Sequence, residues 1–304
     1  MVLFNEKIKI MDYKKNCFIC GHDKFDKYVN DYLRCQRCNH EILDSDLKQK
    51  FIINDDLKPN EIKKVTSLES FKSKVLSTFT NSKVISYLLD IGSGSGKFLY
   101  LNKKNYLKGA GLEITEDAVN FSKNVLNLDV FKDVKDLKND INVATAWHSL
   151  EHFPPNVLEK TLEEISKKMS PNGMLIVSVP NNKSLQYFIF RKSYAFYDVP
   201  SHIHQFSPKS LELLLKKYGF KKGRLITSWP YNRFCMIQSC LNIFNTTHNY
   251  VYYRLKRKNI KSSFYKDFFN FLLILFFTFP ALFFSLIDIL FPERQSVITM
   301  SFKK

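Results

Sequence analysis

The chain has 304 residues, and its 46 Lys and Arg against 29 Asp and Glu give a formal net charge of +17. This length is enough for one sizeable domain with appendages. The charge allows contact with anionic lipid, nucleic acid or phosphorylated substrates but does not select among them. Residues 1–10 carry charged side chains and no long apolar stretch, so we expect no secretory signal peptide there.

Four of the six cysteines form two Cys-x-x-Cys pairs, which favours a metal site in a reducing compartment over disulfides. The predicted ligands are Cys17, Cys20, Cys35 and Cys38. Gly21 and Asn39 can take the left-handed conformation after each pair. The spacing predicts a zinc ribbon over residues 1–50 with a short hairpin between the pairs. Four thiolates leave no position for water, so we expect a structural Zn²⁺ that supplies most of the ribbon's folding free energy.

A Gly-rich stretch follows an apolar run from Val84 to Ile91, which predicts a buried strand. The segment after the glycines has helical periodicity. Strand, glycine turn and helix form the opening unit of a doubly wound nucleotide-binding sheet. Its glycines allow close approach of the backbone to a ligand; they are Gly92, Gly94 and Gly96.

Two carboxylates flank this turn. Asp90 ends the first strand, and Glu113 lies in the segment Gly111–Ile114 that ends the second. A carboxylate in the position of Glu113 accepts hydrogen bonds from ribose hydroxyls. Asp90 would repel a pyrophosphate, yet it can hold the ammonium of a bound amino acid. The pattern Asp-x-Gly-x-Gly-x-Gly therefore favours S-adenosylmethionine (SAM) over a dinucleotide.

On these residues the chain resembles the class I SAM-dependent methyltransferases, over residues 83–231 and the last strand. The Leu-Glu-His after the fourth strand, the Pro-Asn-Gly turn and the Val-Pro-Asn after the fifth strand strengthen the resemblance. It implies an α/β fold, a doubly wound Rossmann-like sheet of seven strands with the last one antiparallel. Because ligands bind at the carboxyl ends of such strands, Trp147 and His148 join the predicted cofactor-binding residues.

The alternation of strands and helices also predicts a mostly parallel sheet with right-handed crossovers. Further strands are expected at residues 128–134, 141–147, 174–179, 224–228 and 296–302. Helices are expected at residues 68–79, 118–125, 157–169 and 209–218, and a turn is expected at 170–173. The helix at 68–79 lies in residues 51–82, which are either a linker or, as the resemblance implies, a helical segment covering the cofactor.

The segment from Ser201 to Pro208 contains His-x-x-x-Phe-Ser. It resembles sugar methyltransferases that carry an N-terminal zinc-binding domain, and the resemblance assigns the role of general base to His202. A neutral imidazole can take a proton from a sugar carbon or hydroxyl near pH 7. Ser201 stands where that family has Glu, which weighs against C-methylation and leaves O-methylation open.

The residues after the fourth strand also resemble a second family, the small-RNA 2′-O-methyltransferases, which place Glu-x-x-Glu-His and a later His around Mg²⁺. The corresponding residues here are His148, Glu151, His152 and either His202 or His204. Imidazole ligands suit Zn²⁺ or Mn²⁺ better than Mg²⁺. Two alternatives stay open for this group: base catalysis, or shaping of the pocket by hydrogen bonds.

Residues 232–293 form a predicted insert before the last strand, which we place at residues 294–304. Within it, Phe268–Phe291 is long enough to span a bilayer. Pairing of the two flanking strands would put both ends of the insert on one side. Pro280 divides the run into halves of roughly 17 Å at 1.5 Å per residue, too short to cross alone. We therefore expect a kinked hairpin with Pro280 at its apex, at the membrane surface.

Basic residues precede this run and would face anionic cytoplasmic headgroups; they are Arg254, Lys256, Arg257, Lys258, Lys261 and Lys266. The alternatives are a buried helical cap, a dimer interface, or a single span if the last strand is misassigned. Cys235 and Cys240 lie in apolar sequence and are expected to be packing residues.

Together these features predict a SAM-dependent methyltransferase acting on a sugar or lipid-linked glycan in cell-envelope biosynthesis, peripheral or monotopic on the cytoplasmic face of the inner membrane. The candidate catalytic residues are His202, His152 and Glu151. The rival is an RNA-binding protein or RNA methyltransferase that uses the ribbon and the basic charge. Aromatic and Lys residues do not alternate in the ribbon, which disfavours nucleic acid. A catalytically silent scaffold is disfavoured by the intact glycines and Glu113.

Overall fold

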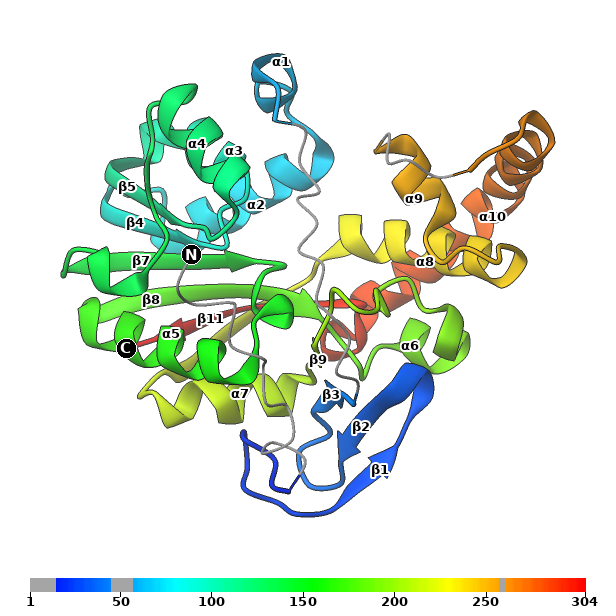
Figure 1. Ribbon diagram of the computed structural model, residues 1–304, viewed down its shortest axis with the longest axis horizontal. Helices are drawn as coiled ribbons and strands as arrows, with labels where there is room; N and C mark the ends of the chain where they lie inside the picture. The colour runs from blue at the N-terminus through cyan, green and yellow to red at the C-terminus, as the bar shows by residue number, and fades with distance from the viewer. Residues whose placement is uncertain (1–14, 45–56, 257–260) are drawn as a thin grey trace.

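The computed structural model describes residues 15–44, 57–256 and 261–304, and its centre is a seven-stranded sheet (Figure 1). The strands, in spatial order, are β10 (Lys221–Ile226), β11 (Val297–Lys303), β8 (Met169–Pro180), β7 (Ile141–Trp147), β4 (Ile85–Ile91), β5 (Tyr106–Leu112) and β6 (Asp129–Phe131). Only β11 runs antiparallel to its neighbours in this sheet. The predicted α/β class and the antiparallel last strand are confirmed.

Helices cover both faces of this sheet. One face carries α2 (Ser67–Thr80), α3 (Lys97–Leu101) and α4 (Glu116–Asn124), and the other carries α5 (Pro155–Lys168) and α7 (Pro208–Lys217) (Figure 1). The apolar spacing explains the packing: Leu158, Leu162 and Ile165 recur at i, i+4 and i+7 and are completely buried. Two short helices, α1 (Pro59–Ile62) and α6 (Leu185–Phe190), complete this part of the chain.

Two local expectations differ from the structure. The turn expected at residues 170–173 lies inside β8, where Asn172 has φ +64° and the pairing of β7 with β8 shifts register between Ile141 and Val143. The expected turn is therefore a local irregularity within one long strand. The strand expected at 224–228 is β10, Lys221–Ile226, because the chain already turns at Ser228 to begin the next helix.

The N-terminal ribbon contains the expected hairpin. β1 (Phe25–Lys27) pairs with β2 (Tyr32–Cys35), and β2 pairs with β3 (Glu41–Leu43). Gly21 and Asn39 take positive φ, as predicted. The ribbon also docks on the main domain, since β3 pairs with β9 (His204–Gln205), a strand that lies more than 150 residues later in the chain. Residues 45–50 of the predicted ribbon and residues 51–56 of the segment predicted as a linker or covering helix lie outside the described residues.

The insert consists of α8 (Trp229–Phe244), α9 (Tyr250–Leu255) and α10 (Phe264–Leu290). The expected hairpin at Pro280 is wrong, because α10 continues through Pro280 as one helix. The two-helix arm is formed instead by α8 and α10. Their antiparallel course follows from two contacts: Phe244 meets Phe269, while the earlier residue Met236 packs with Ala281. Cys235 and Cys240 are buried packing residues, as expected.

By length and composition, one helix among the described residues could span a membrane. It covers Phe264–Phe284, with a mean hydropathy of 1.9, and 11% of its most apolar window is buried. In Figure 1 the arm projects away from the sheet. Of the predicted basic residues, Arg257 and Lys258 lie outside the described residues.

Candidate active site

The glycine loop joins β4 to α3, and its three glycines have positive φ: Gly92 (+69°), Gly94 (+53°) and Gly96 (+74°). Other residues rarely adopt this conformation. A Cβ added at Gly92 would lie 2.5 Å from the Cβ of Ser149. The loop is thus packed against the segment that follows β7, at the carboxyl ends of the strands, where ligands bind to this kind of sheet.

Asp90 is near the end of β4 and is 3% exposed. Its Oδ1 accepts a hydrogen bond of 2.6 Å from Thr145 Oγ1 on β7. Burial raises the pKa of Asp90 to about 7, although the Thr145 bond and the charge of Lys72 oppose the rise. A cationic group placed beside this carboxyl would hold it ionised. The ammonium of a bound amino acid is such a group.

Glu113 follows β5 and connects the loop to the next helix. Its Oε2 accepts the N–H of Gly94 at 2.9 Å, and its Oε1 accepts the N–H of Ile114 and of Thr115 at 2.9 and 2.8 Å. The carboxylate therefore fixes the shape of the loop, a role that the sequence did not reveal. A carboxylate has about four acceptor positions, so one remains for the predicted contact with a ribose hydroxyl.

Trp147 ends β7, and His148 follows it with φ +51°. The His148 ring lies 4.5 Å from the ring of Tyr231 and 5.6 Å from that of Phe196. Trp147 Nε1, His148 Nε2 and the hydroxyl of Ser149 are buried and have no hydrogen-bond partner among the described residues. Such groups are costly unless a ligand or water satisfies them. The strand ends thus fit a polar ligand, which can be SAM or the methyl acceptor.

The predicted catalytic residues come together: Glu151, His152 and His202 each offer a ligating atom, and these atoms lie within 4.8 Å of one another. His152 Nδ1 donates to the Ser201 carbonyl oxygen at 2.7 Å, and His202 Nδ1 donates to the Phe196 carbonyl oxygen at 2.8 Å. A carbonyl oxygen only accepts, so both rings carry a proton on Nδ1. When His202 is neutral, its Nε2 is a proton acceptor.

Burial controls the charges in this group. Glu151 is 0% exposed, and its Oε1 lies 3.3 Å from His148 Nδ1. Burial alone would raise the pKa of Glu151, but the contact with His148 and the other imidazoles lowers it below its usual range. Burial lowers the pKa of His202 to about 4, and His152 adds to this effect while Glu151 opposes it. At neutral pH the group therefore holds a carboxylate beside a neutral imidazole.

His204, the alternative to His202 in the sequence, faces elsewhere. Its Nε2 donates to the Phe153 carbonyl oxygen at 2.9 Å, and its Nδ1 lies 3.1 Å from His40 Nε2. Burial keeps the pKa of His204 well below its usual range, so its Nδ1 accepts the proton of His40. His204 thus joins the ribbon to the main domain and lies outside the Glu151–His152–His202 group.

Sequence reasoning missed the residues that hold His202 in place. Tyr32 of the ribbon donates from its hydroxyl to the His202 carbonyl oxygen at 2.6 Å. On the other side, the Tyr253 hydroxyl in α9 donates to Asp198 at 2.6 Å, and the His202 N–H donates to the Asp198 carbonyl oxygen at 2.8 Å. The ribbon and the insert therefore both support this segment. Nothing in the local pattern around Tyr32 or Tyr253 signals the contact.

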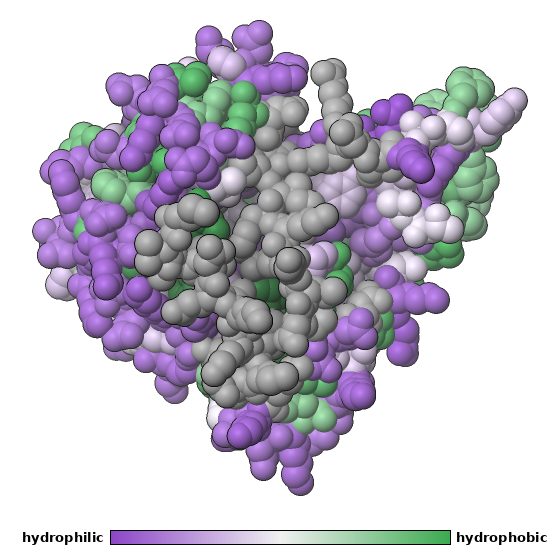
Figure 2. Space-filling view, in the orientation of Figure 1, coloured by the Kyte–Doolittle hydropathy of each residue, from purple (hydrophilic) through white to green (hydrophobic). Residues whose placement is uncertain are grey.

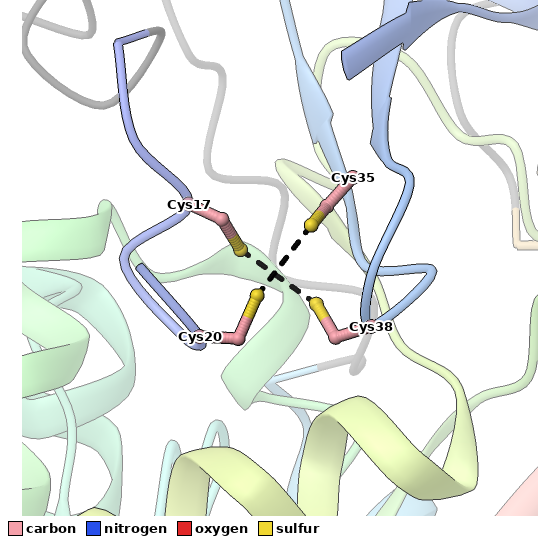
Figure 3. A group of neighbouring side chains, drawn as sticks. All are labelled: Cys17, Cys20, Cys35 and Cys38. Atoms are coloured by element: carbon pink, nitrogen blue, oxygen red, sulfur yellow. Dashed lines mark hydrogen bonds between the residues drawn. The ribbon is translucent and has the colours of Figure 1, made fainter. Parts of the chain in front are cut away.

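The four predicted metal ligands also come together, and their sulfur atoms point toward one another (Figure 3). Cys17 Sγ lies 3.6 Å from Cys38 Sγ, and Cys20 Sγ lies 3.5 Å from Cys35 Sγ. A tetrahedral ion with bonds of about 2.3 Å would space its thiolates by about 3.8 Å. All four are free thiols, so the group could hold a Zn²⁺ ion.

The fold and the site together define a SAM-dependent enzyme of the methyltransferase class. The defining features are the glycine loop, the carboxylates Asp90 and Glu113 at the ends of two strands, and the strand order of the sheet. The profile of a family described as "Methyltransferase domain" matches residues 64–223, more than half of the chain. The chain therefore belongs to this methyltransferase family. No curated protein matches the sequence.

Solved structures share the fold. The cyclopropane synthase MmaA2 from Mycobacterium tuberculosis has a TM-score of 0.51 and 14% identity, over 82% of this chain and 92% of its own. The mycolic acid cyclopropane synthase CmaA1, solved with S-adenosylhomocysteine (SAH), has a TM-score of 0.50 and 12% identity, over 82% and 92%. A SAM-dependent methyltransferase from Archaeoglobus fulgidus has a TM-score of 0.47 and 20% identity, over 78% and 95%.

Proposed function

We propose that this SAM-dependent methyltransferase methylates a hydroxyl of a sugar or lipid-linked glycan, with His202 as the general base. The proposal rests mainly on the buried Glu151–His152–His202 group. This group lies next to the glycine loop, because Ser149 fills the space behind Gly92 and begins the turn that carries Glu151. A proton acceptor thus sits close to the predicted cofactor site.

Bound SAM supplies an electrophilic methyl group. His202 contributes a neutral imidazole whose Nδ1 is fixed on the Phe196 carbonyl oxygen, which leaves Nε2 to accept the proton of an acceptor hydroxyl. Glu151 then stabilises the positive charge that His202 gains. The remaining contribution of the protein is to orient the hydroxyl oxygen toward the methyl carbon.

The polar lining supports an acceptor with several hydroxyls. His148 Nε2 and the Ser149 hydroxyl are buried without a partner among the described residues, and each such group costs about 1–3 kcal/mol if it stays unpaired. A sugar offers donors and acceptors in this number. The resemblance of the His202 segment to zinc-bearing sugar methyltransferases supports the same acceptor.

The four cysteines are proposed to bind one structural Zn²⁺. Their spacing fits four thiolate ligands, and a site closed by four sulfurs has no open position for chemistry. The ion would hold together a ribbon with few core residues of its own. Purified protein should then contain about one zinc per chain by elemental analysis, as expected for a single Cys₄ site.

The acceptor class can be tested with membranes from cells that express the protein, incubated with methyl-labelled SAM. Label that enters butanol, and that is lost with His202→Ala, is the expected result for a lipid-linked glycan. Label that stays in water and resists nuclease would identify a soluble sugar nucleotide instead. Nuclease-sensitive label in water would overturn the proposal in favour of RNA methylation.

A further inference from the structure

The outer face of α10 is a continuous apolar surface. Its aromatic and aliphatic side chains are exposed at helical spacing: Phe268, Leu272, Leu275, Phe279 and Phe283 are 46–79% exposed. From Phe268 to Phe284 the sequence contains no charged residue. Figure 2 shows this hydrophobic surface along the projecting arm. Soluble proteins rarely expose an apolar face of this size without a partner.

The opposite face of α10 packs on α8, and its polar groups are satisfied. Asn270 and Asn245 exchange two hydrogen bonds, of 2.7 and 3.2 Å, between their amide groups. The Thr278 hydroxyl donates to the Ile274 carbonyl oxygen at 2.7 Å. Internal pairing of this kind is a requirement in lipid, where water cannot satisfy polar groups. It leaves the apolar outer face free of unpaired donors.

Basic residues border the apolar surface at two places. Just before α10 begins, Lys261 is exposed. In the first turn of α10, the carboxylate of Asp267 pairs with Arg254 at 3.3 Å, so it adds no net negative charge there. At the other end, Arg191 and Lys192 are exposed just after α6. The preceding α6 residues Phe188 and Ile189 are apolar and 40% and 53% exposed, and their neighbour Phe190 packs against the contact between α8 and α10.

The connections of the arm decide how it can meet a bilayer. α8 leaves from β10, and α10 returns to β11, and these two strands are paired. Both ends of the arm are therefore fixed to one side of the sheet. A helix of 27 residues is about 40 Å long at 1.5 Å per residue, so α10 has the length to lie along a membrane. Crossing it once would separate the two strands.

We propose that the outer face of α10, with Phe188 and Ile189, docks in the interface of an anionic lipid bilayer and holds the enzyme there as a monotopic protein. The apolar face enters the boundary between headgroups and acyl chains, and Lys261, Arg191 and Lys192 contact anionic headgroups. The reduced thiols of the ribbon suit the cytoplasmic face.

This docking also bears on the substrate, a point that rests on the proposed function. Tyr231 in the first turn of α8 contacts His148, and Tyr253 in α9 holds the segment before His202. The same insert that carries the apolar face therefore borders the site. A glycan anchored in the bilayer by its lipid would reach the site without leaving the membrane.

The test is flotation of the purified full chain with vesicles of phosphatidylcholine, with and without phosphatidylglycerol. We expect binding to the anionic vesicles. Binding should fall at least tenfold with the combined variant Phe268→Ser, Phe279→Ser, Phe283→Ser, and should not fall with the control variant Val65→Ser, Leu107→Ser, Val125→Ser. The control residues are 49–76% exposed elsewhere on the chain. The combined Lys192→Glu, Lys261→Glu variant should weaken binding only to anionic vesicles. A thermal shift with SAH verifies that each variant is folded.

Two results would overturn the proposal. One is a wild-type chain that floats with neither vesicle. The other is a wild-type dimer, measured by light scattering, that the triple Phe variant turns into a monomer while flotation stays unchanged, because the face would then join two copies. Vesicle binding needs no methyl acceptor, so a failure of the proposed activity would leave this result intact, and the reverse also holds.

Discussion

The four-cysteine group and the active site each gather polar side chains around a ligand position, but they are assembled differently. The cysteines lie between residues 17 and 38, and two tight turns bring them together. The active site takes residues from β4, β5, the end of β7, the segment before β9 and the start of α8. A local site thus needs little more than turn geometry, whereas a dispersed site needs the completed sheet.

The ribbon and the active site are nevertheless connected. The described contacts join the ribbon to the His202 segment and not to the glycine loop. β3 of the ribbon pairs with β9, and the Tyr32 hydroxyl contacts the His202 backbone. The glycine loop and Glu113 receive no such support from the ribbon in the described contacts. The ribbon should therefore matter for the acceptor and its base, and much less for the cofactor.

The largest expected effect comes from removing the Zn²⁺ proposed for the ribbon. With Cys20→Ser and Cys38→Ser combined, the ribbon should lose on the order of 10 kcal/mol of metal-dependent folding free energy. Misplacement of His202 should then lower methyl transfer about 100-fold or more. The affinity for SAH, measured by calorimetry, should change by about twofold or less, since distant sites contribute independently. An equal loss of both properties would show that the ribbon supports the whole domain.

His202→Ala should come next, lowering kcat about 10²–10⁴-fold with SAH affinity unchanged. Because burial lowers the pKa of His202 to about 4, its neutral form persists from pH 8 down to pH 5. With SAM at saturating concentration, so that the titration of Asp90 does not limit the rate, the wild-type rate should therefore be flat over this range and fall only as the pH approaches 4. A rate that already declines between pH 7 and pH 6 would contradict the buried, neutral imidazole.

Asp90→Asn should act on the cofactor side of the site, opposite His202. It should weaken SAH binding roughly tenfold, because one charged contact is lost. Burial raises the pKa of Asp90 to about 7, and only the ionised form attracts an ammonium. Wild-type affinity should consequently fall as the pH drops from 7 to 5, toward the roughly tenfold weaker affinity of the Asn variant, because protonated Asp90 carries no charge either. The Asn variant should show no such fall in the same calorimetric titration.

The smallest effect is expected for Tyr32→Phe, which removes the hydrogen bond from the ribbon to the His202 carbonyl oxygen. The free energy of unfolding should decrease by about 1 kcal/mol. A modest decrease in kcat should accompany it, with SAH affinity unchanged. Tyr253→Phe, which removes the contact from α9 to Asp198, is the matched variant on the other side. A decrease in SAH affinity for Tyr32→Phe would contradict the inference that the ribbon supports only the acceptor side of the site and not the cofactor side.

Patterns within a short stretch predicted much of this molecule. The two Cys-x-x-Cys turns, the turn with three glycines, and the strands predicted at 84–91 and 141–147 depend on local backbone geometry and apolar spacing. The structure has these turns, and its strands are Ile85–Ile91 and Ile141–Trp147. The insert shows the limit of such patterns. Proline usually interrupts a helix, so Pro280 predicted a bend, but packing on α8 keeps α10 continuous.

The sequence by itself determined the α/β class, the glycine loop, the two Cys-x-x-Cys turns and the apolar character of the insert, because each depends on residues near one another in the chain. Only the tertiary structure decided that Glu151, His152 and His202 share one buried group, that His204 faces the ribbon instead, and that Glu113 fixes the loop. These outcomes depend on which distant strands pair, and on burial, which sets the charge of each group once its neighbours are in place.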